Sequence, residues 1–263
     1  MDLGLKGKRA LVAASSRGLG RAIAEELAAE GCDLLICARS GGPLEATRSE
    51  IAAAHGVRVL AHTADLSKAD QAGAVVRRAL DELGQVDILV TNNGGPPSGP
   101  FESHDLKAWH HTYHLTLESV LVLTHGVLPG MKERRWGRIL NVTSITVKQP
   151  VDGLILSNSL RAAVTGFART LANEVAPFGV TVNNIIPGYT RTERLDELAE
   201  QASREGDVTP EEVFAKWSAQ TPMDRVAEPR ELAAMAAFLV SERASYVTAQ
   251  SIAVDGGWIR SLF

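Results

Sequence analysis

Three polar side chains, Ser144, Ser157 and Arg161, have the types and the spacing to act together on a bound ligand. Ser144 follows directly on Arg138–Thr143, a largely apolar segment with the composition of a buried strand. Ser157 and Arg161 are four residues apart and would share one face of a helix. Because ligands of an open parallel sheet bind beyond the carboxyl ends of its strands, the three side chains can meet over one ligand there. Their types alone do not decide whether they carry out chemistry on it.

The elements that must position these side chains alternate between strand-like and helix-like segments. The expected strands are Arg9–Ala14, Asp33–Ala38, Val57–His62, Val86–Thr91, Arg138–Thr143, Val180–Ile185 and Ser251–Val254. The expected helices are Leu19–Glu30, Pro43–His55, Lys68–Leu83, about 105–134, Asn158–Val175 and Pro229–Val240. This alternation predicts an α/β fold with a parallel sheet covered on both faces, and right-handed crossovers make the sheet doubly wound. No linker interrupts it, so residues 1–263 are predicted to form a single domain.

The region 189–225 is the exception to this alternation. It is polar and has no strand-like run, and its helix-prone part, Thr192–Ser218, is interrupted at Gly206 and Pro210. A mobile cover over a ligand crevice has this character, so we predict a substrate lid here.

The composition excludes several classes of protein. The chain has 263 residues, of which 45% are hydrophobic and 22% charged, and its formal net charge is −4. It has no dense block of Lys and Arg, and we interpret the basic segment 132–138 as a solvated helix end, so no nucleic-acid partner is expected. No signal peptide and no apolar run of roughly 18 residues is present, so no membrane association is expected. Cys32 and Cys37 would face opposite sides of one strand, too far apart for a disulfide, which favours a reducing cytoplasm.

The turn between the first strand and the first helix has the composition of a nucleotide-binding turn. Its sequence is Ala13-Ala14-Ser15-Ser16-Arg17-Gly18-Leu19-Gly20. Small residues there let backbone amides approach a phosphate, and the helix N-terminus favours negative charge. The structural alternative is a tight turn that only packs the helix on the sheet. After the first strand of an alternating chain, Gly18 and Gly20 favour a dinucleotide.

The charges near this turn favour NADP(H) over NAD(H). Arg39 follows the second strand, where the adenine ribose would lie, and Ala38 offers no acid there. An acid would bind the ribose 2′-hydroxyl and repel a 2′-phosphate, whereas Arg39 and Arg17 offer cations. The alternative is that Arg39 is only a solvated strand end.

These features resemble the short-chain dehydrogenase/reductase family nearly from end to end, and in particular its bacterial carrier-protein ketoreductase-like members. Besides the glycine-rich turn, the matching motifs are Asp65-Leu66, Asn92-Asn93-Gly94-Gly95, Pro187-Gly188 followed by Thr192, Pro222-Met223-x-Arg225 and Asp255-Gly256-Gly257. The resemblance implies a seven-stranded Rossmann sheet, often in homotetramers. It also implies that the cofactor is contacted by Ser15, Ser16, Arg17, Gly18, Leu19, Gly20, Arg39, Asp65, Leu66, Asn92, Gly94, Arg161, Pro187, Gly188 and Thr192.

The catalytic positions depart from the family pattern. The family uses Asn, Ser, Tyr and Lys, the last two as Tyr-x-x-x-Lys, and Ser144 matches the serine. Ser157 stands at the tyrosine position, Arg161 at the lysine position, and Thr116 at the usual asparagine. A serine hydroxyl is a far weaker acid than tyrosine, and an arginine stays protonated, so neither replaces routine proton transfer. We expect Ser144 to orient a substrate oxygen, Arg161 to hold the cofactor ribose or an anionic substrate group, and Ser157 to make a polar contact or position a water.

Other titratable groups leave alternatives open. Tyr189 either supplies a proton or packs at the base of the lid, and Lys148 is interpreted as a solvated loop residue. His110 and His114 have the i, i+4 spacing of two metal ligands, but no acid or cysteine accompanies them in a motif, so no metal site is expected.

The sequence therefore predicts an NADP(H)-dependent oxidoreductase that acts on a small carbonyl or alcohol substrate through an altered proton-transfer site. The resemblance adds a cytoplasmic homo-oligomer, either a dimer or a tetramer. The alternative is a catalytically degenerate cofactor-binding protein, acting as a redox sensor or a partner subunit. A third hypothesis, loss of the cofactor site itself, rests on Ala14, which replaces the first glycine of the family turn.

Overall fold

The structure, a computed structural model, describes residues 1–262, apart from the side chain of Glu205. Seven parallel strands form one sheet in the order β3-β2-β1-β4-β5-β6-β7. The strands are β1 (Arg9–Val12), β2 (Asp33–Ala38), β3 (Val59–Thr63), β4 (Ile88–Thr91), β5 (Gly137–Val142), β6 (Val180–Pro187) and β7 (Ser251–Val254). The predicted doubly wound α/β fold is confirmed, with small shifts at the strand ends.

The strand order reverses between β1 and β4, which pair directly with each other. In sheets of this kind the ligand crevice lies outside the carboxyl ends of the strands at such a reversal. The glycine-rich turn follows β1, residues 92–100 follow β4, and Ser144 lies just beyond β5. The topology therefore brings the segments singled out from the sequence to one edge of the sheet.

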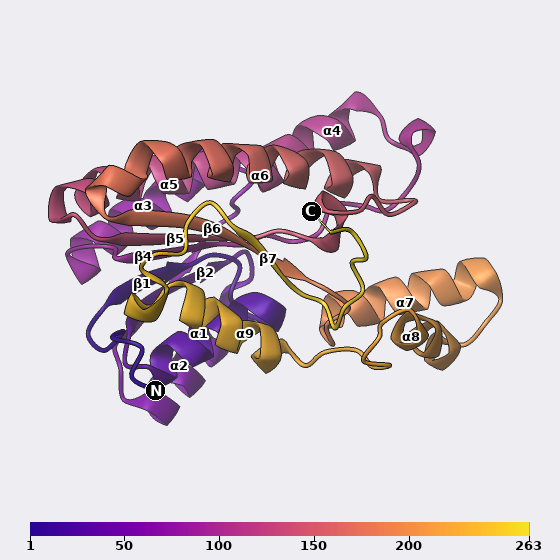
Figure 1. The fold of residues 1–263 in the computed structure, drawn as a ribbon, viewed down its shortest axis with the longest axis horizontal. Coiled ribbons are helices and arrows are strands. Elements are labelled where there is room, and N and C mark those ends of the chain that lie inside the picture. The colour runs from indigo at the N-terminus through magenta and orange to yellow at the C-terminus, as the bar shows by residue number, and fades with distance from the viewer. Residues whose placement is uncertain (263) are drawn as a thin grey trace.

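Helices cover both faces of the sheet (Figure 1). One face carries α1 (Gly18–Ala29), α2 (Gly41–His55) and α9 (Pro229–Leu239), and the other carries α3 (Ala69–Leu83), α5 (Ser119–Arg134) and α6 (Ile155–Val175). β4 is buried along its whole length, as its unbroken apolar sequence predicts. Alternate side chains of β2 enter two separate apolar clusters, one against α1 and one against α3. The core thus has two layers that share the sheet.

The predicted helix at about 105–134 is interrupted by a π-helix. α4 (Leu106–Tyr113) is capped by Asp105, whose carboxylate accepts the Ala108 N–H at 2.9 Å. His114–Glu118 form the π-helix, and α5 follows without a break at Pro129. Pro129 does not shorten the helix, because the buried side chains on either side of it hold α5 against the sheet.

α6 begins at Ile155, earlier than the predicted start at Asn158. Leu156 is fully buried and extends the apolar stripe of the helix by one turn toward its N-terminus. Ser157 therefore lies in the first turn of α6, and Arg161 lies one turn later on the same face.

The region 189–225 contains α7 (Glu193–Gly206) and α8 (Pro210–Ala219), which project from the sheet as a separate arm (Figure 1). Thr192 caps α7 and Thr209 caps α8, and each accepts the backbone N–H of the third residue of its helix. The predicted breaks at Gly206 and Pro210 are confirmed, because α7 ends at the first and α8 begins at the second.

The two cysteines behave as the sequence predicts. Cys32 packs in the apolar cluster against α1 and Cys37 in the cluster against α3, and both are free thiols. Burial raises the pKa of the Cys32 thiol to about 12 and that of the Cys37 thiol to about 11. Both therefore stay protonated at neutral pH and act as small core residues. In the described chain, no helix combines the length and the apolar character needed to cross a lipid bilayer.

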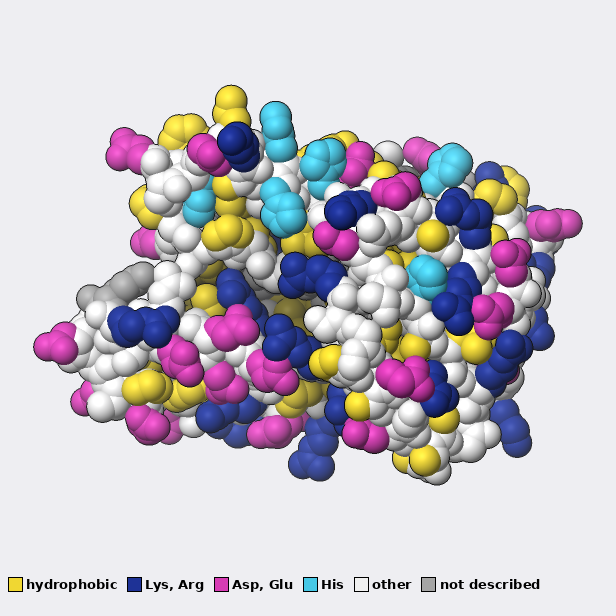
Figure 2. Space-filling model, turned by 180° about the vertical axis from the view of Figure 1, so that it is seen from behind, with side chains coloured by type: hydrophobic (Ala, Val, Ile, Leu, Met, Phe, Trp, Pro, Cys, Tyr) yellow, Lys and Arg dark blue, Asp and Glu magenta, His cyan; other side chains and the backbone are white. Residues whose placement is uncertain are grey.

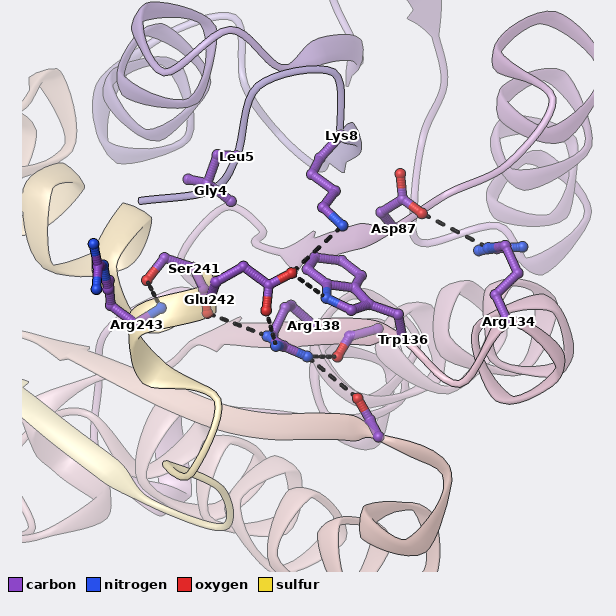
Figure 3. Close-up of polar contacts among 12 residues, drawn as sticks. Gly4, Leu5, Lys8, Asp87, Arg134, Trp136, Arg138, Ser241, Glu242 and Arg243 are labelled. Carbon is purple, nitrogen blue, oxygen red and sulfur yellow. Dashed lines mark hydrogen bonds and ion pairs between the residues drawn. The ribbon is translucent and has the colours of Figure 1, made fainter. Parts of the chain in front are cut away.

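The basic segment 132–138 is not a solvated helix end throughout, as the sequence analysis expected. Arg138 is only 3% exposed and lies in β5. Its guanidinium packs 4.4 Å from the Trp136 ring centroid and 3.6 Å from the carboxylate of Glu242, which also accepts the Trp136 indole N–H at 2.7 Å (Figure 3). The expectation failed because an arginine near the start of a strand can be buried when a distant residue supplies its counter-charge.

We expect Glu242→Ala to lower the free energy of unfolding by about 1–3 kcal/mol, because it leaves the buried Arg138 cation without a carboxylate. The loss is smaller than for a fully buried pair, since Glu242 is itself half-exposed. Glu242→Gln, which keeps the acceptor for Trp136, should cost less.

Urea unfolding measures this effect, with Glu133→Ala, an exposed glutamate on α5, as the matched control. Equal midpoints for Glu242→Ala and the control would show that Glu242 does not compensate Arg138.

Candidate active site

The crevice at the carboxyl ends of the strands is bounded by the segments after β1, β4, β5 and β6 and by the α7–α8 arm. Figure 2 shows a hollow between the α4 side and the α7–α8 side, with side chains of Lys and Arg inside it. Acidic side chains gather on the outer surface of the arm, in keeping with the composition of α7. The hollow itself thus presents positive charge.

The first position of the glycine-rich turn has the left-handed backbone conformation, although alanine and not glycine stands there. Ala14 has φ +48°, a conformation that costs an alanine about 1–2 kcal/mol, and Asn92 Nδ2 donates to its carbonyl oxygen at 3.2 Å. At Gly20 a Cβ atom would lie 2.3 Å from the same oxygen, so only glycine fits. Ser15 is buried. Its hydroxyl donates to Val12 O and its backbone N–H donates to Cys37 O, so its side chain shapes the turn.

The N-terminus of α1 has no side chain that caps it in the described structure. The preceding residue, Arg17, ion-pairs with Glu193 of α7 and lies 4.0 Å from Glu197. A Cβ at Gly18 would lie 3.6 Å from Thr192 Cγ2, so the start of the arm rests against the turn. Uncapped helix amides beside small residues form the cradle that a phosphate requires.

The residues predicted to meet the adenosine end lie at the ends of β2 and β3. Arg39 is exposed, and it forms no ion pair within 4 Å in the part of the chain that the structure describes. Burial opposes ionisation of Asp65, but hydrogen bonds from Ser67 and the charges of Arg39 and Lys68 outweigh it and lower its pKa. Leu66 is buried. The free cation of Arg39 is thus held near an ionised carboxylate.

Ser144 follows the end of β5, and Arg161 reaches that end from α6, where Ser157 lies one turn before it. Ser144 Oγ accepts the Thr146 N–H at 3.3 Å and caps the short turn 145–147, against which α6 packs. This bond uses an acceptor position of the hydroxyl, so its own proton remains free for another partner. Ser157 is 8% exposed, and its side chain makes no hydrogen bond with any described residue.

Arg161 is held by neutral oxygens only. Nη1 donates to Val142 O at 2.9 Å and to Thr143 O at 3.1 Å, and Nη2 donates to Asn93 Oδ1 at 3.1 Å. Burial, and secondly the positive charge of Arg194, lower the pKa of Arg161 to about 10. It therefore remains a cation at neutral pH and cannot shuttle protons.

Two residues of this site were not found from the sequence, because their partners are distant in the chain. Asn93 lies in the predicted motif after β4, but nothing in the sequence indicated its bond to Arg161. Arg194, at the start of α7, donates to Pro96 O at 3.1 Å across the crevice. Thr116 Oγ1 is buried in the π-helix without a hydrogen-bond partner in the described chain.

Tyr189 and His114, which the sequence analysis also considered, have structural partners. The Tyr189 ring stacks on Trp217 at 5.2 Å, its hydroxyl donates to Gln220 at 3.3 Å, and burial raises its pKa. This is the packing arrangement at the base of the arm. Lys148 is exposed. His114 lies 2.6 Å from the Glu118 carboxylate, and no group of three metal-ligating side chains occurs among the residues described.

Comparison with known proteins places this geometry in a family. A sequence model of a family described as enoyl-(acyl carrier protein) reductase matches residues 13–259. The 3-oxoacyl-acyl-carrier-protein reductase FabG of Aquifex aeolicus is 34% identical over 261 residues, covering 98% of this chain and 99% of that protein. D-beta-hydroxybutyrate dehydrogenase of Cupriavidus necator is 35% identical over 263 residues, covering 97% and 99%.

The fold agrees with solved structures of similar proteins. L-sorbose reductase from Gluconobacter frateurii, complexed with NADPH and L-sorbose, matches with a TM-score of 0.95 and 32% identity over 100% of both chains. Actinorhodin polyketide ketoreductase with NADPH matches with a TM-score of 0.93 and 33% identity, over 97% of this chain and 98% of that one. The chain belongs to the short-chain dehydrogenase/reductase family of oxidoreductases.

Proposed function

We propose that the protein is an NADPH-dependent oxidoreductase that reduces a carbonyl group, or oxidises the corresponding alcohol, with Ser157 and Arg161 in place of the family's tyrosine and lysine. The observation that carries this proposal is the intact cradle at the start of α1: Ala14 adopts the left-handed conformation and Gly20 allows the close approach of the backbone. Similar proteins whose structures contain NADPH support the choice of cofactor.

The residues present fit a dinucleotide. Backbone amides of Ser16–Gly20 would hold the pyrophosphate at the uncapped helix end, and Asp65 with Leu66 would contact the adenine. Arg39, which forms no ion pair within 4 Å in the described chain, would take the 2′-phosphate. Asn92, Gly94, Pro187, Gly188 and Thr192 would surround the nicotinamide end. These contacts remain predictions from the family resemblance.

Bound NADPH supplies a hydride for the carbonyl carbon. The chain's residues have to orient the carbonyl, hold the charge that develops on oxygen, and deliver a proton. Ser144 can donate the free proton of its hydroxyl to the substrate oxygen, and the fixed cation of Arg161 favours negative charge near it. Because serine is smaller than tyrosine, Ser157 leaves space for a water that can serve as the proton source.

One observation favours the second hypothesis, a cofactor-binding protein without turnover. Three N–H groups of Arg161 are used on Val142, Thr143 and Asn93, so the residue braces the end of β5 as a structural element. A protein that only binds the cofactor would still need these hydrogen bonds of Arg161 and the phosphate-binding turn. It would need no proton donor.

Cofactor titration followed by a carbonyl panel separates the two hypotheses. We expect NADPH to bind more tightly than NADH, and Arg39→Ala to weaken NADPH about tenfold while leaving NADH unchanged, since a charge-assisted contact is lost. Arg48→Ala, which removes a nearby arginine paired with Glu45, is the control.

Steady-state reduction of panel members by the purified protein supports the oxidoreductase. Tight NADPH binding without turnover of any member contradicts it and supports the cofactor-binding alternative. An equal loss of affinity for NADPH and for NADH in Arg39→Ala would refute the assignment of Arg39 to the 2′-phosphate. A cytoplasmic homo-oligomer with the α7–α8 arm as a substrate lid stays a prediction, which light scattering tests in part.

A further inference from the structure

The crevice contains a buried cation without a counter-charge. Arg161 is 8% exposed, and in the described part of the chain no carboxylate lies within ion-pair distance of it. Burying an arginine costs several kcal/mol, which carbonyl and amide oxygens offset only in part. Arg138, the other buried arginine, has Glu242 as its counter-charge, so the fold supplies one where the role is purely structural. An unpaired cation at the ligand edge points to an anion that is not part of the protein.

Arg161 also has donors to spare. A guanidinium carries five N–H groups, and the three hydrogen bonds to Val142, Thr143 and Asn93 use three of them. Nε and the second hydrogen of Nη2 have no acceptor among the described residues. Two neighbouring donors on one guanidinium are the arrangement that grips a carboxylate with both of its oxygens.

A second guanidinium contacts the same loop from the other side of the crevice. Arg161 holds residue 93 from α6, whereas Arg194 of α7 donates to the Pro96 carbonyl oxygen. Arg194 Nε lies 3.1 Å from where a Cβ on Gly95 would stand, so the absence of a side chain at position 95 lets it approach. At Gly94 no atom lies within 4 Å of the corresponding position, so the space that a side chain there would occupy is open.

The acids around the site do not neutralise Arg161. Glu197 lies 3.3 Å from Arg194 and 4.0 Å from Arg17, and Glu193 pairs with Arg17, so both acids are paired with exposed arginines. Neither reaches Arg161. The smaller side chain at Ser157 adds room on the same face of α6, next to the cation.

We propose that Arg161 and Arg194 form a subsite for a carboxylate of the substrate, so that the protein acts on an oxo acid or the corresponding hydroxy acid. This assignment of a substrate class rests on the proposed oxidoreductase function. The anion that fits is small and planar, because it must reach the spare donors of Arg161 beneath the loop 93–96.

The test that does not depend on turnover is calorimetric titration of the NADPH-bound protein with malonate and with its neutral diamide, malonamide. We expect malonate to bind and malonamide not to bind. Arg194→Gln should lower the affinity for malonate at least tenfold. Arg191→Gln, which changes another arginine in the same region, should not lower it. Arg161→Lys keeps the charge but loses the two-donor grip, and should also weaken malonate, with thermal unfolding checking that the fold is kept.

Turnover of matched pairs, each an oxo acid and its methyl ester, gives the second readout. We expect the ratio of kcat/KM for acid over ester to fall about 10- to 100-fold in Arg194→Gln. Equal rates for acids and esters, together with no malonate binding, overturn the carboxylate subsite and leave the oxidoreductase function standing. Arg194-dependent malonate binding without any turnover supports the subsite and contradicts the oxidoreductase function. A third outcome is that Arg194→Gln lowers the affinity for NADPH while the unsubstituted protein does not bind malonate. This result would show that the positive charge of Arg194 serves the cofactor, and it would overturn the carboxylate subsite.

Discussion

The double substitution Ser157→Tyr with Arg161→Lys is expected to raise kcat for a neutral ketone by about 10²- to 10⁴-fold, the usual contribution of general acid catalysis. Position 157 lies in the first turn of α6 and faces the end of β5 together with Arg161. A tyrosine there brings a phenol of pKa about 10, which a neighbouring lysine lowers toward neutrality. A lysine also keeps a positive charge beneath the loop after β4. Steady-state rates at saturating NADPH measure the gain.

The single substitutions and a matched control make this result interpretable. Ser159→Tyr puts the same ring on an exposed face of α6 and should leave kcat unchanged. Each single change at 157 or 161 should give less than the pair, because the phenol and its cation act as a unit. A double variant that unfolds at the same temperature as the parent, binds NADPH and shows no gain would mean that the crevice no longer places a ketone for the ordinary chemistry.

Ser144→Ala is expected to lower kcat about 10²- to 10³-fold with little change in KM, because it removes the hydroxyl that would donate to the developing oxyanion. The substitution also removes the cap of the turn 145–147, which costs about 1 kcal/mol of stability. The two effects have to be separated, since a loosened turn could lower activity by itself.

Ser241→Ala is the control for the lost cap. Ser241 caps the turn 242–244 by accepting the Arg243 N–H at 3.1 Å, at the opposite end of the sheet. It should lower the unfolding temperature to a similar extent and leave kcat intact. Similar activity losses in both variants would remove Ser144 from the chemistry, and recovery of activity in Ser144→Thr would support its hydroxyl as the donor.

Most of the fold could be predicted because its helices and strands are specified by residues that are close together in the sequence. Unbroken apolar runs such as Ile88–Thr91 specify strands buried on both faces, and Gly84 and Gly206 mark the ends of helices α3 and α7. The start of α6 was missed because its first turn has no capping side chain, and only the burial of Leu156 extends the helix. The π-helix was missed because no residue type specifies it.

The site was predicted in outline, since the ends of parallel strands must meet at one edge of the sheet. Its charges could not be predicted. The burial of Arg161 against Asn93, and the reach of Arg194 to Pro96, join residues that are 68 and 98 positions apart in the chain. The same holds for Arg138, whose carboxylate partner Glu242 comes from the far end of the sequence. Pairings of this kind depend on the completed tertiary structure.

The π-helix at His114–Glu118 makes the shape of the crevice depend on the number of residues in the chain as well as on their identities. Its wider turn accommodates one residue more than an α-helical turn would. Deleting a single residue there would let α4 and α5 merge into one regular helix while α4 keeps the face that it presents, because the wider turn already absorbs the extra residue. The change in length would therefore act at the π turn itself, where Thr116 is buried, and would leave the rest of the α4 wall in place.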